Sequence, residues 1–265
     1  MIVPELLLPV VTDPRGASVV CDFDGTISAI VADPADAVPL PGALDALGAL
    51  AQRIGSVAVV SGRPVAWLAQ QLAPIADAPI ELHGMYGLET WHGAAAVAVD
   101  EAVPWRAVID GITAAAIASM PASVLVEPKG LSVGLHYRAK PDDEPAVMSW
   151  AREQVQVHGV ALLTGRLAVE LRPPIDRDKG HATAEFLVRH RPRAVVFLGD
   201  DTGDVPAGQA VRSYAAATHA AGVVICVDSA ETPAAMRDIA DLRVAGPTEA
   251  VALLAALARE AEVKS

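Results

Sequence analysis

Short runs of apolar, often β-branched residues recur in the first and last thirds of the chain. They comprise Ala17–Cys21, Ser56–Val60, Ala194–Leu198 and Gly222–Val227. Continuous apolar runs are typical of strands buried on both faces, as in a parallel sheet. Segments with helical spacing alternate with them, such as residues 39–53 and 251–260. This alternation predicts an α/β fold in which helices cover both faces of a parallel sheet.

The middle of the chain has a different pattern. Two pairs of short apolar runs flank turn sequences, one at Pro128-Lys129-Gly130 and one at Thr164-Gly165-Arg166. Each pair predicts a β-hairpin, and residues 142–156 between the pairs predict a helix. We therefore expect an α+β insertion over residues 102–176, within a core formed by residues 1–101 and 177–265.

Charge and composition narrow the possible partners. The 265 residues include 32 acidic and 20 basic ones, which gives a formal net charge of −12. This balance argues against nucleic acid and anionic membranes as partners, and an anionic ligand would need local Lys, Arg or metal. No long uncharged apolar run or signal-peptide pattern occurs, so we expect a cytoplasmic protein. The only two cysteines, Cys21 and Cys226, lie in apolar runs and are expected to be buried free thiols.

Two carboxylates follow the first apolar run, in the sequence Asp22-Phe23-Asp24-Gly25-Thr26. Residues two apart on a strand point the same way, and two such close carboxylates repel each other unless a cation or proton lies between them. Mg²⁺ is the natural cation for ligands that are all oxygen. A solvated acidic turn is the alternative interpretation of Asp-x-Asp alone. The complete run after an apolar strand favours a functional site.

The chain resembles the haloacid-dehalogenase superfamily of phosphohydrolases in four motifs that occur in order. They are the Asp22–Thr26 run, Ser61 after the second strand, Lys179 in Asp178-Lys179-Gly180, and the acidic run Gly199–Asp204. The resemblance implies a Rossmann-like core with an inserted cap domain. It also implies that Asp22 is the nucleophile and Asp24 the acid and base, while Ser61 and Lys179 hold the phosphoryl group.

The resemblance also implies a Mg²⁺ site and residues that support it. The carboxylates of Asp22 and Asp200 and the main-chain carbonyl of Asp24 would bind the metal. Asp201 and Asp204 would orient these ligands or their waters.

Further motifs resemble the trehalose-6-phosphate phosphatase family. They are Ser61-Gly62-Arg63, His83–Glu89, Glu127–Gly130, His136-Tyr137-Arg138, Val169–Pro173 and Asp178–Gly180. By this resemblance Gly62 and Arg63 bind the substrate, and the cap residues Glu127, Lys129, Arg138 and Glu170 contact the sugar and its phosphate. Lys129, at a hairpin tip, is expected to be the most exposed of the four. The acidic motif departs from the family's common Gly-Asp-Asp-x-Thr-Asp-Glu, since Gly203 and Val205 replace Thr and Glu.

The resemblance thus predicts hydrolysis of trehalose 6-phosphate, a small-molecule sugar phosphate, through an aspartyl phosphate. Two alternatives stay open at this point. One is a phosphatase for another sugar phosphate, such as sucrose phosphate or a glycosyl-glycerate phosphate. The other is a catalytically silent sugar-phosphate sensor, which the Asp22 and Asp24 pair disfavours because a sensor needs no acid or base. The sequence leaves the oligomeric state open, and a monomer is compatible with it.

Overall fold

Two compact units make up the chain. The structure is a computed structural model that describes residues 2–31, 33–92, 94–165 and 167–263. The larger unit comprises residues 1–96 and 177–265, and the smaller one comprises residues 97–176. The sequence pattern placed the first boundary a few residues later, at 101/102, and the second at 176/177. A role for the smaller unit as a cap stays a prediction.

The larger unit contains a mainly parallel sheet in the order β12-β11-β10-β1-β2-β3-β4-β5. Its strands are β1 Ala17–Cys21, β2 Ser56–Val60, β3 Ile80–Gly84, β4 Glu89–His92, β10 Ala194–Gly199, β11 Ala221–Asp228, β12 Leu242–Ala245 and β5 Ala95–Ala98, whose last two residues are counted with the smaller unit. The six strands from β12 to β3 are parallel, whereas β4 runs antiparallel to β3. The parallel sheet expected from the four apolar runs is confirmed, and those runs form its centre.

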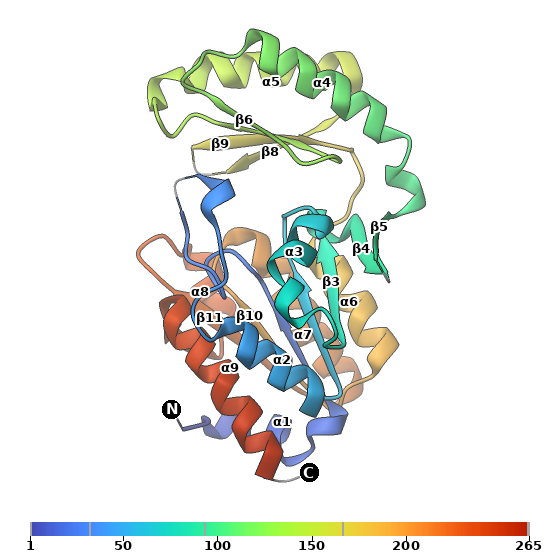
Figure 1. The fold of residues 1–265 in the computed structure, drawn as a ribbon, viewed down its shortest axis with the longest axis vertical. Coiled ribbons are helices and arrows are strands. Elements are labelled where there is room, and N and C mark those ends of the chain that lie inside the picture. The colour runs from blue at the N-terminus through green and yellow to red at the C-terminus, as the bar shows by residue number, and fades with distance from the viewer. Residues whose placement is uncertain (1, 32, 93, 166, 264–265) are drawn as a thin grey trace. The chain divides into compact units, whose positions relative to one another are not determined.

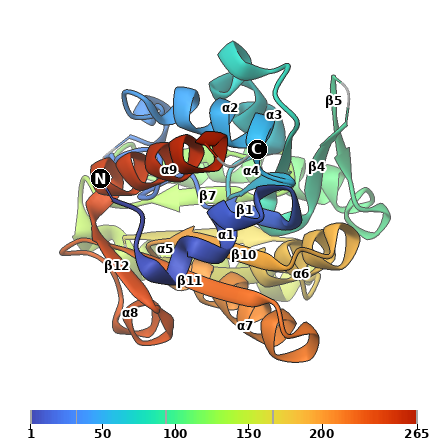
Figure 2. The same ribbon diagram turned by 90° about the horizontal axis from the view of Figure 1, so that it is seen from below.

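Helices cover both faces of this sheet (Figure 2). They are α1 Leu8–Thr12, α2 Ala43–Arg53, α3 Val65–Gln71, α6 Lys179–His190, α7 Val205–Thr218, α8 Ala234–Ile239 and α9 Gly246–Val263. Val19 and Cys21 of β1 point into one core with α1, α2, α3 and α9. Val20 between them points into the other core, with α6, α7 and α8. Because successive side chains of a strand alternate, a fully apolar strand fills both cores.

Two predicted helices have different bounds in the structure. The helix expected over residues 39–53 begins at Ala43, because Pro39 forms a β-bridge with Ser28, and Pro41 and Gly42, with φ of 82° at Gly42, form a turn before the helix. The helix expected over residues 251–260 is longer and spans Gly246–Val263. Cys21 and Cys226 are buried free thiols, as expected.

The smaller unit is a two-layer structure (Figure 1). Its four-stranded sheet has the order β6-β7-β9-β8, with β6 Leu125–Pro128, β7 Val133–His136, β8 Ala161–Gly165 and β9 Ala168–Arg172. Helices α4 Trp105–Ser119 and α5 Glu144–His158 pack on one face, over Val133, Leu135, Val169 and Leu171. The other face carries charged side chains. The two strand pairs agree with the predicted hairpins, but Arg166 of the second turn lies outside the described residues, and α4 was not predicted.

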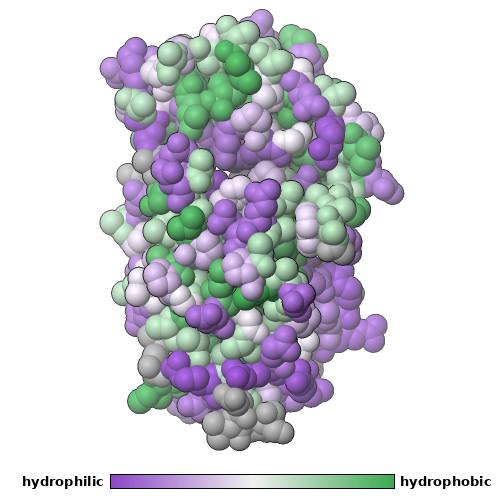
Figure 3. Space-filling model, in the orientation of Figure 1, coloured by the Kyte–Doolittle hydropathy of each residue, from purple (hydrophilic) through white to green (hydrophobic). Residues whose placement is uncertain are grey.

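Hydrophilic and hydrophobic residues are interspersed on the face shown in Figure 3. Single exposed apolar side chains, such as Ile117, Val157 and Val188, are normal on a protein surface. None of the helices in the described parts of the chain has the length and apolar character of a membrane-spanning segment.

The core beneath α6 gives a test of the packing. Phe186 is fully buried there, whereas Val188 on the same helix is 66% exposed. We expect Phe186→Ala to lower the free energy of unfolding by about 3–5 kcal/mol, because the change removes buried apolar area and leaves a cavity. Val188→Ala is the matched control and should change it by less than about 0.5 kcal/mol. Urea titration followed by circular dichroism measures both, and equal effects would contradict this packing.

Candidate active site

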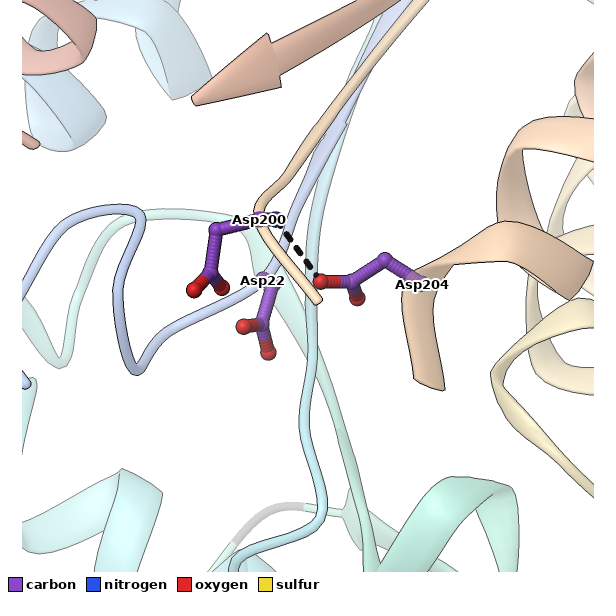
Figure 4. Close-up of side chains that lie close together, drawn as sticks. All are labelled: Asp22, Asp200 and Asp204. Carbon is purple, nitrogen blue, oxygen red and sulfur yellow. Dashed lines mark hydrogen bonds between the residues drawn. The ribbon is translucent and has the colours of Figure 1, made fainter. Parts of the chain in front are cut away.

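Asp22 and Asp200 lie side by side because they follow neighbouring parallel strands. Asp22 comes directly after β1 and Asp200 directly after β10, and these strands pair up to Cys21 and Leu198. The amide of Asp22 continues the ladder by donating to the carbonyl of Leu198 at 2.9 Å. Asp22 is 3% exposed and Asp200 is 5% exposed. Figure 4 shows their carboxylates close together at this edge of the sheet, where ligands of open α/β sheets bind.

Asp204 approaches from the start of α7 and is held by main-chain donors. Its Oδ2 accepts a hydrogen bond from the amide of Asp200 at 2.9 Å (Figure 4) and another from the amide of Asp201 at 3.2 Å. Asp201 in turn accepts from the amide of Gly203 at 2.7 Å, and a reciprocal capping box links Asp201 with Asp204. These bonds fix the acidic loop, and with it the direction of Asp200. They agree with an orienting role for Asp204, although its carboxylate lies close enough to those of Asp22 and Asp200 to share a metal.

Lys179 joins the two sides of this cluster. It is the first residue of α6, whose N-cap Asp178 accepts a hydrogen bond from the amide of His181 at 3.0 Å. Its Nζ donates to Oδ1 of Asp22 at 2.7 Å and to Oδ1 of Asp204 at 2.8 Å. The side chain is buried, so both contacts form away from bulk water. A charge-assisted bond of this kind fixes one oxygen of Asp22.

The electrostatics of the cluster favour a divalent cation. Burial, and then repulsion by Asp204, raises the pKa of Asp22 well above its usual value, although Lys179 opposes this. The same two causes raise the pKa of Asp200 to about 8. Burial lowers the pKa of Lys179, but attraction by Asp204 and Asp22 outweighs it and holds that pKa well above the usual value. Three buried carboxylates face one ammonium, so their oxygens fit a hard cation such as Mg²⁺.

Gly25 permits the close approach of the first loop to Asp200. Its φ is 75°, and a Cβ at this position would lie 2.2 Å from Oδ2 of Asp200. Any other residue would therefore strain the backbone and displace that carboxylate. The contact with Asp200 thus explains sterically why the first motif has a glycine at position 25, which the sequence pattern alone did not explain.

Arg63 contacts Asp24, the residue predicted to act as acid and base. Its Nε donates to Oδ2 at 2.8 Å and its NH2 to Oδ1 at 2.7 Å, a bidentate pair. NH1 donates to the carbonyl of Pro34 at 2.8 Å, and the guanidinium lies 4.5 Å from the ring centroid of Trp67. These contacts engage the guanidinium with groups of the protein itself. Substrate binding by Arg63 therefore stays a prediction.

Ser61 and Gly62 form the loop after β2. Ser61 is buried, its amide donates to the carbonyl of His83 at 2.9 Å, and its Oγ accepts from the amide of Arg63 at 3.1 Å. The hydroxyl proton of Ser61 is therefore left to donate elsewhere. Within the described residues the amide of Gly62 makes no hydrogen bond. Both groups can donate to an oxyanion.

Three of the four predicted cap residues form one cluster in the smaller unit. Glu127 pairs in register with Gly134, and Gly134 with Glu170, so the two carboxylates flank a residue without a side chain. Nζ of Lys129 lies 2.9 Å from Glu170 and 3.4 Å from Glu127. Oε1 of Glu170 is buried and has no hydrogen-bond partner among the described residues. The cluster therefore offers an acceptor to a ligand.

One expectation about the cap residues needs correction. The side chain of Lys129 is only 12% exposed, because both glutamates draw it onto the sheet, so it is not the most exposed of the four. Arg138, in the turn after β7, is the exposed one and has no ion pair in the described parts of the chain. The cluster instead includes His136, whose Nε2 lies 2.8 Å from Glu127.

Other supporting residues escaped the sequence analysis. Trp67, which stacks on Arg63 and meets Phe23 edge-on at 5.0 Å between ring centroids, gave no signal beyond an aromatic in a helix. His136 could have been connected with Glu127 through the hairpin, because the two strands pair across its turn.

Comparison with solved structures defines the class of fold. The chain is similar to a trehalose-6-phosphate phosphatase related protein, with a TM-score of 0.77 and 22% identity over 94% of this chain and 100% of that one. It is also similar to a haloacid dehalogenase-like hydrolase from Bacteroides thetaiotaomicron, with a TM-score of 0.58 and 14% identity over 93% and 98% of the two chains. The fold is that of the haloacid-dehalogenase-like hydrolases, as the motifs predicted.

Sequence comparison gives the family. Residues 20–241 match the family model described as trehalose-phosphatase. A trehalose-phosphate phosphatase from Mycobacterium marinum is 38% identical over 213 residues, which is 76% of this chain and 52% of the relative. The chain belongs to the trehalose-phosphatase family. It spans about half the length of the curated relatives it matches.

The raised pKa of Asp200 gives a prediction for the metal-free protein. This carboxyl binds its proton more tightly when folded, with a pKa of about 8 against an ordinary 3.8. Stability should therefore fall as pH rises from about 4 toward 8. We expect the melting temperature in EDTA to decrease from pH 5.5 to pH 8. Added Mg²⁺ should restore it, most strongly at pH 8.

Asp200→Asn is the control for this experiment. It should flatten the pH dependence in EDTA and reduce the rise caused by Mg²⁺, because the titrating carboxyl group, which is also a predicted metal ligand, is gone. Differential scanning fluorimetry measures both effects. A melting temperature in EDTA that rises steadily with pH would contradict the assignment.

Proposed function

We propose that the chain is a magnesium-dependent phosphomonoesterase that hydrolyses trehalose 6-phosphate to trehalose and phosphate through an aspartyl phosphate. The observation that carries this proposal is the buried carboxylate of Asp22, held by Lys179 at the edge of the sheet next to Asp200. Membership of the trehalose-phosphatase family supports the substrate, and so do the names of the relatives. The proposal includes a cytoplasmic location.

Asp22 is the nucleophile in this proposal. Lys179 holds its Oδ1 at 2.7 Å, which leaves Oδ2 to form the bond to phosphorus. The hydroxyl of Ser61, the amide of Gly62 and the ammonium of Lys179 hold the oxygens of the phosphoryl group during transfer.

The carboxylates of Asp22 and Asp200 and the main-chain carbonyl of Asp24 would hold Mg²⁺. When bound, the cation supplies charge neutralisation for the phosphoryl group and for the carboxylates around it. Asp204 keeps Asp200 in place through the loop amides, and Asp201 keeps that loop closed.

Asp24 carries the proton transfers. The two N–H bonds from Arg63 orient the carboxylate of Asp24, which in this proposal is the base that takes a proton from water when the aspartyl phosphate is hydrolysed. In the first step Asp24 must carry a proton and give it to the departing sugar oxygen, which requires it to turn from Arg63. Release of Asp24 from Arg63 is thus required, in this proposal, before Asp24 can protonate the departing sugar oxygen.

The small-molecule partner is a sugar phosphate. The carboxylates of Glu127 and Glu170 accept hydrogen bonds from sugar hydroxyls, and Lys129 and Arg138 supply positive charge for its phosphate. The buried Oε1 of Glu170 supports this, because an acceptor without a partner gains most from a ligand hydroxyl.

Substitution of the two aspartates tests the chemistry. Asp22→Asn should reduce turnover of every phosphomonoester by at least about 1,000-fold, because the amide cannot attack phosphorus. Asp24→Asn should reduce turnover of a sugar phosphate by about 100-fold or more, yet affect p-nitrophenyl phosphate less, because nitrophenolate leaves without a proton. Steady-state release of phosphate measures both. Near-normal turnover by Asp22→Asn would remove it as the nucleophile.

A substrate panel tests the identity of the sugar. With Mg²⁺ present, trehalose 6-phosphate should have the highest kcat/KM among trehalose 6-phosphate, sucrose phosphate, glucosyl-glycerate phosphate and glucose 6-phosphate. A better rate with another member would reassign the substrate within the phosphatase class. Binding without release of phosphate from any member would instead support the silent sensor.

A further inference from the structure

The turn after β3 has an unusual backbone. Met85, Tyr86 and Gly87 have φ values of 51°, 58° and 87°, so three successive residues adopt the left-handed conformation. For residues other than glycine such a conformation costs about 1–3 kcal/mol each, and it persists only where neighbouring contacts enforce it. The motif that contains this turn has no role in the chemistry described above.

Main-chain hydrogen bonds fasten the turn to the loop after β2. The amide of Met85 donates to the carbonyl of Arg63 at 2.8 Å, and the amide of Tyr86 donates to the carbonyl of Ser61 at 3.0 Å. The turn is therefore aligned with the residues that flank Gly62 on both sides.

The other side of the turn packs against the start of α6. A Cβ at Gly87 would lie 2.8 Å from Cβ of Ala182, and Nε of Arg177 donates to the carbonyl of Gly87 at 2.6 Å. Lys179 begins this helix. The turn thus lies between the loop of Ser61 and the helix of Lys179, the two predicted phosphate-holding elements.

The side chain of Tyr86 reaches over Gly62. A Cβ built on Gly62 would lie 2.7 Å from Cζ and 2.8 Å from the hydroxyl oxygen of Tyr86. The phenol therefore fills the space that a side chain at position 62 would take, and Gly62 is required for its approach. This brings the phenol hydroxyl close to Gly62, the residue that follows Ser61.

We infer that Tyr86 is a further substrate-contacting residue, whose hydroxyl donates a hydrogen bond to the phosphoryl group bound by Ser61, Gly62 and Lys179. The inference rests on the proposed function for the identity of that site. A neutral donor suits this place, because it can stabilise a phosphate oxygen without another buried charge beside Lys179 and its carboxylates. The left-handed backbone at Met85 and Tyr86 is explained in this inference as the conformation that orients the tyrosine ring over Gly62.

Tyr86→Phe tests the hydroxyl alone, with inorganic phosphate as the probe and Mg²⁺ present. Its dissociation constant, measured by calorimetry, should rise about 10-fold, since a hydrogen bond to a charged group is lost. The KM for p-nitrophenyl phosphate should rise similarly, with kcat changed less. Tyr214→Phe is the matched control, because that hydroxyl donates to the carbonyl of Pro192 at 3.1 Å, away from the carboxyl edge of the sheet. It should leave phosphate affinity unchanged.

Tyr86→Asn distinguishes loss of the tyrosine ring from loss of folding. Asparagine tolerates positive φ, so this variant should keep a melting temperature close to that of the wild type while binding phosphate at least as weakly as Tyr86→Phe. If Tyr86→Phe does not fold, the asparagine variant decides the question alone. Phosphate affinity within two-fold of the wild type in the variants that fold overturns the inference, as does a wild type that binds no phosphate.

The test of Tyr86 does not depend on which sugar phosphate is the substrate, because its probe is inorganic phosphate. If phosphate affinity falls as expected but trehalose 6-phosphate is not hydrolysed, the inference about Tyr86 stands and the proposed function fails. If trehalose 6-phosphate is the best substrate and the Tyr86 variants bind phosphate normally, the proposed function stands and Tyr86 has only a structural role.

Discussion

The contact of Lys179 with Asp22 and Asp204 stabilises the edge of the larger unit's sheet where the candidate active site lies. One ammonium bridges a residue at the end of β1 and a residue at the start of α7, and its own helix begins at the same place. Removing one partner of such a buried pair leaves an uncompensated charge, which costs several kcal/mol. The ammonium therefore stabilises the relative positions of these three elements, in addition to the packing of the core beneath them. This makes Lys179 a structural residue as well as a candidate for phosphate binding.

Local pattern was sufficient to predict the centre of the sheet but not its edges. β1 and β2 match the apolar runs because strands buried on both faces have no polar positions to obscure them. β3 begins with half-buried Ile80 and Glu81, and β5 is largely exposed, so neither stands out by hydrophobicity. Helix α4 was missed for a related reason. Four of its five alanines lie on the exposed side and weaken the helical periodicity on which the prediction relied.

The sequence predicts the positions of those site residues that directly follow a strand. Asp22, Ser61 and Asp200 each follow a strand of one parallel sheet, so their nearness follows from topology. The partners of these residues could not be predicted in this way. Arg63 and Asp24 are far apart in the sequence, and whether an arginine turns to a carboxylate or to a ligand depends on side-chain geometry. The same limit applies to Lys129, whose low exposure results from two glutamates on separate strands.

The row Glu127, Gly134 and Glu170 has a consequence for how this unit tolerates change. Register fixes the row across three strands, and neighbouring strands lie about 4.8 Å apart, so the backbone sets the separation of the two carboxylates. Because side chains alternate along a strand, insertion or deletion of one residue within β7 would place Val133 or Leu135 between the glutamates and turn His136 to the opposite face. Substitutions in these strands can adjust ligand preference gradually. A change in their length would abolish the cluster in a single step.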